Sequence, residues 1–245
     1  MSRYILKLSE KIIEVNCIYE SAEILCKDYI SDGIPDFSVT ITSEDIDYER
    51  VKSVSEDDIK EGIPIRRFSD SYLETLAVYR KICNELILCN TILFHGSAVS
   101  VDGKGYIFTA RSGTGKSTHT RLWREYFGER AVMINDDKPL IRICEADALV
   151  YGTPWDGKHR LSSNTSVPLK AICILERGEE NNIEKISRAS AYPMLLQQVN
   201  RPDNALKMKK TLELIDSLAD NTELYKLRCN MNISAAETAF NGMNK

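Results

Sequence analysis

The sequence predicts an α/β protein that carries a small β-rich subdomain at its N-terminus. After residue 70, apolar strand-like segments alternate with segments of helical periodicity, and a glycine-containing loop at 110–118 joins a strand to a helix. Residues 1–65 contain instead short apolar clusters separated by Asp, Ser, Gly and Pro. We therefore expect two domains, 1–68 and 69–245.

The length and composition fit this organisation. The chain has 245 residues, of which 43% are apolar and 28% charged, as in ordinary globular proteins. The formal net charge of −4 gives no electrostatic sign of a nucleic-acid partner. No apolar run reaches the roughly 18 residues of a membrane span. The seven cysteines contain no C-x-x-C pair, so we expect reduced thiols and a cytoplasmic protein without disulfides or zinc.

The N-terminal region predicts strands and no catalytic site. The chain starts as an alternating strand, and the apolar clusters at 4–6, 12–13 and 37–41 are typical of short strands. An acidic stretch follows at 55–58. No residues here have catalytic spacing, so we expect a module for packing or for recognising a partner.

The second domain begins with a helix and a strand–turn–strand segment. Ser71 and Glu74 have the spacing of a capping box, and apolar residues then recur at helical intervals, which predicts a helix over 70–89. An apolar strand over 91–99, a turn at 102–105 and a second strand at 106–109 lead directly into the glycine-containing loop. Further elements follow the loop: helix 116–127, strands 131–134, 139–143, 148–151 and 170–175, a polar loop at 152–168, helices near 189–199 and 203–219, strand 225–229, and a helix opening at Ser234.

Residues 110–118 form a phosphate-binding P-loop, or Walker A motif. Successive backbone N–H groups of 112–118 at a helix N-terminus converge on phosphate, and Gly113 and Gly115 permit the backbone angles that this requires. Lys116 would reach the β- and γ-phosphates, and the Ser117 hydroxyl would ligate Mg²⁺. Ala110 replaces the first glycine of the usual pattern. The nucleotide-binding residues are thus Ser112, Gly113, Thr114, Gly115, Lys116, Ser117 and Thr118.

Asp136 and Asp137 follow the strand at 131–134 and are the natural partners of the loop. One carboxylate could hold the metal, because Mg²⁺ prefers oxygen ligands, while the other deprotonates an acceptor hydroxyl. The alternative is a solvated turn with an Asx-type hydrogen bond. We assign the metal to Ser117 and Asp136, and which aspartate is the base stays open.

The segment from His95 to Lys116 resembles the C-terminal kinase domain of HPr kinase/phosphorylase. The resemblance consists of a His-Gly pair at 95–96, an S-G-x-G-K-S loop core, and the Asp136-Asp137 pair at a strand end. The loop and the aspartates are also similar to ATP-dependent phosphoenolpyruvate carboxykinase. The resemblance implies a P-loop core with a mixed β-sheet of this type, covers about residues 91–140, and is thin elsewhere.

The resemblance also implies a reaction and its participants. It implies ATP as the donor, a serine-type hydroxyl as the acceptor, Mg²⁺, a catalytic set of His95, Lys116, Asp136 and Asp137, and a homo-oligomer. The chain lacks a recognisable HPr kinase C-terminal signature, which leaves the acceptor open between a protein, a peptide and a small metabolite.

The loop at 152–160 stands where that signature would lie. It contains two glycines, a tryptophan and cationic side chains, and Trp155, Lys158 and Arg160 are candidates for a substrate-side loop that stabilises phosphoryl charge. A surface turn with a tryptophan lid over the core is an equal alternative. In and after the P-loop, we expect Arg111 and His119 to face solvent and Trp123 to pack.

Three functions therefore compete. The first is a Mg·ATP-dependent kinase. The second is a nucleotide-gated binding module that has lost catalysis, for which Ala110 and the 152–160 loop are the grounds. The third is carboxykinase-like chemistry, which the chain length and the absence of oxaloacetate-binding arginines disfavour.

Overall fold

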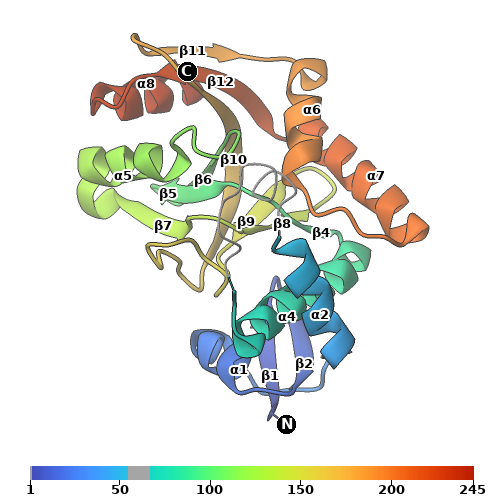
Figure 1. Cartoon of the computed structure of the whole chain (residues 1–245). Helices are drawn as coiled ribbons and strands as arrows, with labels where there is room; N and C mark the ends of the chain where they lie inside the picture. The colour runs from blue at the N-terminus through green and yellow to red at the C-terminus, as the bar shows by residue number, and fades with distance from the viewer. Residues whose placement is uncertain (1, 55–66) are drawn as a thin grey trace. The chain divides into compact units, whose positions relative to one another are not determined.

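The computed structural model describes residues 2–54 and 67–245 (Figure 1). The acidic stretch predicted at 55–58 lies outside these described residues. The chain forms two compact units, Met1–Glu85 and Leu86–Lys245. The sequence placed the boundary between 68 and 69, whereas the division between the units falls between Glu85 and Leu86, at the end of helix α4. Among the described residues, no helix has the length and apolar character needed to cross a bilayer.

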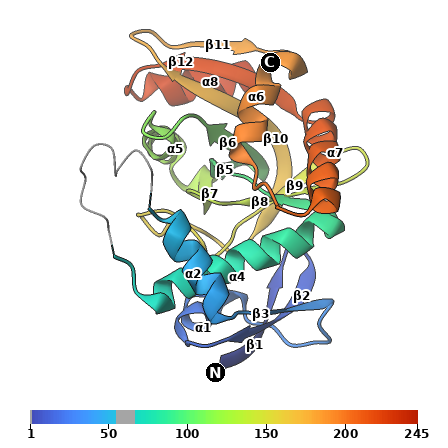
Figure 2. The ribbon, with the colours of Figure 1, turned by 45° about the vertical axis from the view of Figure 1, so that its right-hand side comes forward.

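The N-terminal unit contains a three-stranded sheet, where the sequence predicted a small β-rich subdomain. Strands β1 and β2 form an antiparallel hairpin, and β3 pairs parallel to β2 (Figure 2). Its elements are β1 (Ser2–Leu8), β2 (Lys11–Cys17), α1 (Ser21–Leu25), η1 (Lys27–Tyr29), β3 (Phe37–Thr40), α2 (Ser43–Lys52) and α4 (Asp70–Leu86).

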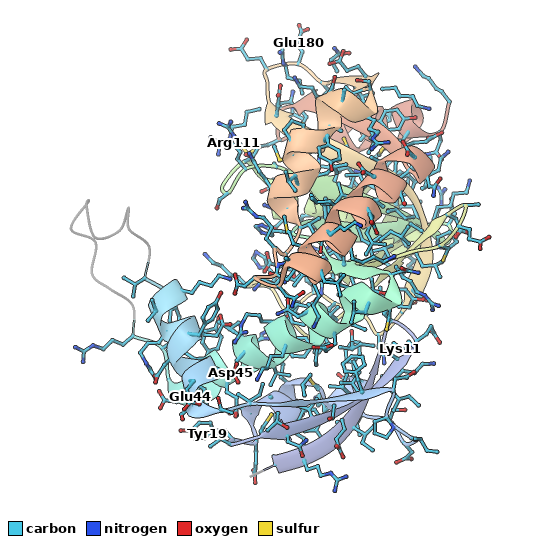
Figure 3. All side chains as sticks on the ribbon, turned by 90° about the vertical axis from the view of Figure 1, so that its right-hand side faces the viewer. Lys11, Tyr19, Glu44, Asp45, Arg111 and Glu180 are labelled. Carbon is cyan, nitrogen blue, oxygen red and sulfur yellow. The ribbon has the colours of Figure 1, made fainter. Side chains whose placement is uncertain are left out.

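Polar contacts from α4 organise this unit. Glu74 is fully buried, and its carboxylate accepts hydrogen bonds from the backbone N–H groups of Ile18 (2.6 Å) and Tyr19 (2.9 Å), just after β2. Asp45 lies in the first turn of α2, beside Glu44 (Figure 3). Its Oδ1 accepts a hydrogen bond from Nη2 of Arg80 of α4 (3.1 Å). Helix α2 was not predicted, because its short run of mostly polar residues lacks an apolar stripe.

The C-terminal unit is built on a curled, mixed sheet of nine strands among the described residues. The order is β4-β8-β9-β10-β6-β5-β7, with β12 against β10 and β11 against β12. The elements are η2 (Ile87–Cys89), β4 (Thr91–Leu93), β5 (Ser97–Val101), β6 (Lys104–Thr109), α5 (Lys116–Phe127), η3 (Gly128–Arg130), β7 (Ala131–Asn135), β8 (Leu140–Ile143), β9 (Ala148–Tyr151), β10 (Ser166–Arg177), β11 (Asn182–Lys185), α6 (Arg188–Gln198), α7 (Ala205–Asn221), β12 (Glu223–Cys229) and α8 (Ser234–Met243).

Helices cover both faces of this sheet (Figure 1). Apolar residues of α6 and α7 pack with Ile172 and Ile174 of β10 on one face. Residues of α5 and α8 pack with Ala171, Cys173 and Leu175 on the other. Because side chains alternate along a strand, β10 supplies both layers and is buried over most of its length.

The elements predicted in this unit are confirmed, with three corrections. The expected strand over 91–99 is two strands, β4 and β5, which separate at His95 and Gly96. Strand β10 begins at Ser166, inside the expected polar loop, and β11 was missed. All seven cysteines are free thiols.

Candidate functional site

Strand directions bring the candidate residues to one edge of the sheet. Strands β6 and β7 both run antiparallel to β5. The C-terminal ends of β6 and β7 therefore lie at the same edge as the N-terminal end of β5. That edge carries the P-loop after β6, the two aspartates after β7, and His95 just before β5.

The P-loop has the backbone that its sequence predicts. Gly113 and Gly115 have φ values of 76° and 123°, which side-chain-bearing residues rarely adopt. Ala110, in contrast, has a negative φ and is buried, so its methyl group costs the loop nothing in backbone strain. No side chain caps the N-terminus of α5 at Gly115. The N–H groups of the first helical turn therefore suit an anion.

A cavity of about 430 Å³ lies between the P-loop and the aspartates. It is lined by His95, Ser112, Gly113, Gly115, Lys116, Ser117, Thr118, Asp136, Asp137, Gly157, Lys158 and His159. The structure thus places the candidate catalytic residues, the candidate metal ligands and most of the loop around one space. Thr114 lines neighbouring cavities instead.

The break between β4 and β5 sets the position of His95. Gly96 at this break donates its N–H to the Asp137 carbonyl oxygen (3.0 Å), and Thr109 Oγ1 donates to the His95 carbonyl oxygen (3.1 Å). A Cβ atom on Gly96 would lie 2.8 Å from Ile107 Cγ2, so the strand can approach β6 this closely only at a glycine. Gly96 therefore allows the close strand approach that places His95.

His95 and Asp137 form a pair that faces the cavity. His95 Nε2 lies 3.1 Å from Asp137 Oδ1. Burial raises the pKa of Asp137, but the hydrogen bond from His95 and the charges of Lys138 and Lys116 outweigh it, so the pKa lies below its usual range. Asp137 is therefore ionised at neutral pH. Burial also lowers the pKa of Lys116, and the charge of Asp137 opposes this shift.

Asp136 has a different environment and one carboxylate oxygen without a hydrogen bond. The residue is 4% exposed, and its Oδ1 accepts the backbone N–H of Gly157. Its Oδ2 is buried and has no hydrogen-bond partner among the described residues. Burial raises the pKa of Asp136, the Gly157 hydrogen bond opposes the rise, and the charges of Asp156 and Asp137 add to it.

This arrangement fits a Mg²⁺ ion that is shared with a phosphate. The orphaned Oδ2 of Asp136 is a hard oxygen ligand, and the exposed Ser117 hydroxyl lines the same cavity. No group of three or more His, Cys, Asp or Glu side chains in 2–54 and 67–245 could hold a metal by itself. Mg²⁺ usually keeps several waters and binds through one or two carboxylates plus substrate phosphates, so a full protein cage is not required.

Asn135 holds the backbone turn that carries the two aspartates, and it was missed as a site residue from the sequence. It is fully buried, and its Oδ1 accepts the backbone N–H groups of Asp137 (2.9 Å) and Lys138 (2.6 Å). Its Nδ2 donates to the carbonyl oxygen (3.1 Å) and hydroxyl (3.0 Å) of Thr153. The Asx-type hydrogen bond of the alternative is therefore present, but the turn is buried rather than solvated, and the bond holds the backbone that carries the two carboxylates. The Asn-Asp-Asp order at a strand end was the available signal.

Replacing Asn135 by alanine is expected to lower the free energy of unfolding by about 2 kcal/mol or more. The change leaves the Asp137 and Lys138 N–H groups and the Thr153 carbonyl without their partner in a buried turn. Urea unfolding measures the loss. Ser166→Ala, at an exposed position at the start of β10, is the control. A stability equal to the wild type would contradict the role given to Asn135.

The comparisons with known proteins give a family. The model of the family described as "SynChlorMet cassette protein ScmC" matches residues 67–234. The chain belongs to this ScmC family. No curated protein sequence matches the chain.

A solved structure also resembles this ScmC family protein. The structure of the Hpr(Ser) kinase/phosphatase from Coxiella burnetii is similar to it with a TM-score of 0.33 and 10% sequence identity. The similarity covers 61% of this chain and 94% of that chain. The likeness is distant.

The 152–160 loop of the ScmC chain contributes Lys158 to the cavity and buries its tryptophan. Trp155 is 4% exposed and belongs to the interior. Arg160 lies 3.2 Å from the carboxylate of Asp156, to which it donates. Only Lys158 of the three candidates is both exposed and among the residues lining the cavity.

Gly157 of the same loop closes on Asp136. A Cβ atom at residue 157 would lie 2.8 Å from Asp136 Oδ2 and 3.0 Å from its Cγ, so Gly157→Ala must displace the carboxylate. We expect this variant to fold but to bind Mg·ATP more weakly than the wild type. Calorimetric titration with ATP, with and without Mg²⁺, measures the effect. Equal Mg²⁺ dependence in both proteins would show that Asp136 keeps its place.

The sequence predicted whether three side chains in and after the P-loop face solvent or pack, and one of these predictions was wrong. Arg111 is exposed, as predicted (Figure 3). Trp123 is fully buried, as predicted. His119 was expected to face solvent, and this was wrong, because it is 2% exposed. It packs edge-on against Phe108, with ring centroids 4.5 Å apart, and accepts a hydrogen bond from Trp123 Nε1 (3.0 Å). Burial lowers the pKa of His119 to about 3, so the ring is neutral.

Proposed function

We propose that this ScmC family protein is a Mg·ATP-dependent phosphotransferase of HPr kinase type, with a P-loop core of the HPr kinase/phosphoenolpyruvate carboxykinase type. It would transfer the γ-phosphate to a serine-type hydroxyl of a protein, a peptide or a small metabolite. The observation that carries the proposal is the ionised Asp137, paired with His95, on the same cavity as Lys116 and Ser117. A simple phosphate-binding loop needs no such pair.

Each residue has a role in this reaction. The 112–118 backbone and Lys116 would bind the phosphates, and Ser117 and Asp136 would hold Mg²⁺, which neutralises phosphate charge when bound. Asp137 would accept the proton of the acceptor hydroxyl while the oxygen of that hydroxyl forms a bond to the γ-phosphorus. The bond from that phosphorus to the β,γ-bridging oxygen breaks, and ADP leaves. His95 would hold Asp137 in place, and Lys158 would stabilise the phosphoryl charge.

The aspartate environments support this division of labour. Asp137 is ionised and accepts a hydrogen bond from His95. The His95 side chain is 43% exposed, so an acceptor hydroxyl can reach the His95–Asp137 pair. Asp136 is more buried and has the orphaned oxygen that suits a metal. Pairs of carboxylates whose pKa values differ commonly take different roles.

A radiolabel transfer screen tests the proposal. Protein is incubated with γ-labelled ATP and Mg²⁺, and with panels of serine-containing peptides and hydroxyl metabolites. Label should reach an acceptor with the wild type and fall by about 10²-fold or more with Lys116→Ala, which removes a charge from the phosphates. Addition of EDTA should have the same effect.

The competing binding module makes the opposite prediction. One reason to infer a module that has lost catalysis was that Ala110 replaces a glycine of the P-loop motif, but the loop backbone accommodates alanine at this position. Calorimetric binding of ATP without transfer to any acceptor would favour the module and overturn the kinase. The homo-oligomer implied by the family resemblance remains a prediction, and size-exclusion chromatography with light scattering measures it.

A further inference from the structure

A second cavity lies beside the P-loop, away from the aspartates. It has a volume of about 450 Å³, within the range of small-molecule sites. It shares Gly113, Gly115 and Thr118 with the cavity described above. The aspartates, His95 and Lys116 are not among its lining residues. One ligand could therefore lie along the loop and occupy both spaces.

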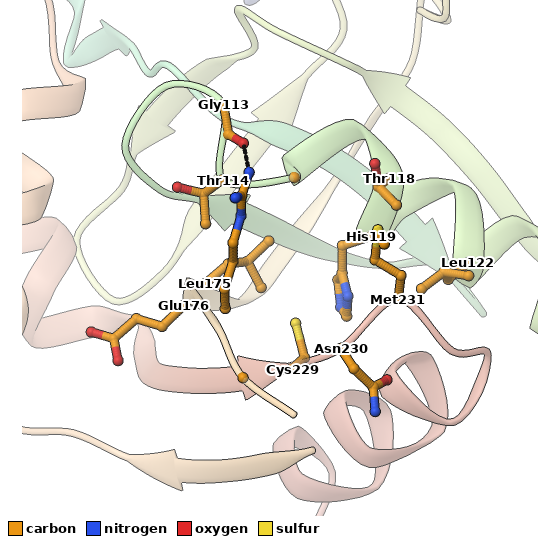
Figure 4. A pocket seen from close by; sticks show the side chains of 13 residues that line it. Gly113, Thr114, Thr118, His119, Leu122, Leu175, Glu176, Cys229, Asn230 and Met231 are labelled. Atoms are coloured by element: carbon orange, nitrogen blue, oxygen red, sulfur yellow. Dashed lines mark hydrogen bonds between the residues drawn. The ribbon is translucent and has the colours of Figure 1, made fainter. Parts of the chain in front are cut away.

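Its walls are mostly apolar. Leu122 of α5 and Leu175 of β10 line it, and Met231 stands at its rim with 78% of its surface exposed. Figure 4 shows His119 and Cys229 pointing into the same space from α5 and from the end of β12. Apolar walls with few polar groups suit a flat, largely apolar ligand.

His119 offers this cavity a buried donor. Its Nε2 accepts the Trp123 indole N–H, and an imidazole nitrogen that accepts a hydrogen bond carries no proton. The proton of the ring is therefore on Nδ1, which is buried and has no hydrogen-bond partner among the described residues. A buried donor without a partner is unfavourable, and a ligand acceptor would remove that cost.

Two of the other polar side chains that line the cavity, Asn230 and Arg177, have hydrogen-bond partners in the protein. Asn230 donates to the Glu179 carbonyl oxygen (2.8 Å) and accepts from the Asn232 N–H (3.0 Å). Arg177 donates to the Gly113 carbonyl oxygen (2.6 Å) and so ties β10 to the P-loop (Figure 4). The Nδ1–H of His119 is a buried donor without such a bond, so it would set the orientation of a ligand.

We propose that this second cavity binds the nucleobase of the nucleotide whose phosphates lie on the P-loop, with a ring nitrogen of the base accepting the His119 Nδ1–H. A nucleobase has flat apolar faces and ring-nitrogen acceptors at its edge, which matches the walls and the donor. The inference rests on the nucleotide binding in the proposed function, and it is independent of phosphate transfer.

Calorimetry with two ligands tests the role of His119. ATP carries a base, whereas inorganic tripolyphosphate has only the phosphate chain. His119→Phe should weaken ATP binding about tenfold and leave tripolyphosphate binding unchanged, while Lys116→Ala should weaken both. An equal effect of His119→Phe on the two ligands, or no effect on ATP, would overturn the proposal.

A second measurement uses the wild-type protein and avoids any loss of folding. Cys229 lines the cavity, and Cys144, which is also half-buried, is a control that does not line it. Iodoacetamide labelling, read by mass spectrometry, should show that ATP protects Cys229 and not Cys144, and that tripolyphosphate protects neither. Labelling of Cys229 that ATP does not slow would contradict the nucleobase site. Protection without phosphate transfer would support the site and count against the kinase.

Discussion

Asp137→Asn is expected to lower the rate of phosphate transfer by about 10²- to 10⁴-fold, the usual contribution of a general base. Asparagine keeps the shape of the side chain and can still accept the hydrogen bond from His95, but it cannot take a proton. ATP binding should change much less than the rate. Labelled transfer and calorimetry on the same preparation separate the two effects.

The pH dependence gives this prediction a second readout. The pKa of Asp137 is lowered in the folded state, so the residue adds stability above its unfolded pKa of about 3.9. That stability is lost as the pH falls through the lower, folded value. Asp137→Asn should therefore be less stable than the wild type near neutral pH, and the difference should vanish in strong acid. A transfer rate within a few-fold of the wild type would remove Asp137 as the base.

Local sequence signals predicted the elements that hold the site. The glycines of the P-loop have the positive φ values that their spacing indicated, and helix α5 begins at Lys116, where the motif placed it. The strand before the aspartates is also present. These features depend on a few neighbouring residues, and short-range patterns describe them well.

Features that depend on contacts far along the chain could not be predicted. The apolar residues around His95 fit one continuous strand, but pairing of β4 with β8 and of β5 with β6 and β7 separates it into two. His119 is polar and was expected outside, yet Phe108 and Trp123 enclose it. Asn135 acts through Thr153, 18 positions away in sequence. Tertiary packing decides all three.

Asp136→Asn is expected to separate stability from function. Because burial raises the pKa of Asp136 above its unfolded value, ionising this carboxylate opposes folding, and this penalty is complete once the pH exceeds the folded pKa. Asparagine removes the charge and keeps an oxygen for the Gly157 N–H. Without Mg²⁺, the variant should therefore be more stable than the wild type at neutral pH, as thermal unfolding would show.

The same change should weaken Mg²⁺ binding in the presence of ATP by roughly 100-fold, since loss of a mere outer-shell partner of a metal ligand already costs 10- to 100-fold. In the wild type, Mg²⁺ affinity should fall as the pH drops through the raised pKa of Asp136, because protons compete with the metal for the carboxylate. The variant should lack this dependence. Titration of Mg²⁺ at several pH values measures both effects. A variant that binds Mg²⁺ like the wild type would move the metal away from Asp136, and Asp137 would then have to serve as both ligand and base.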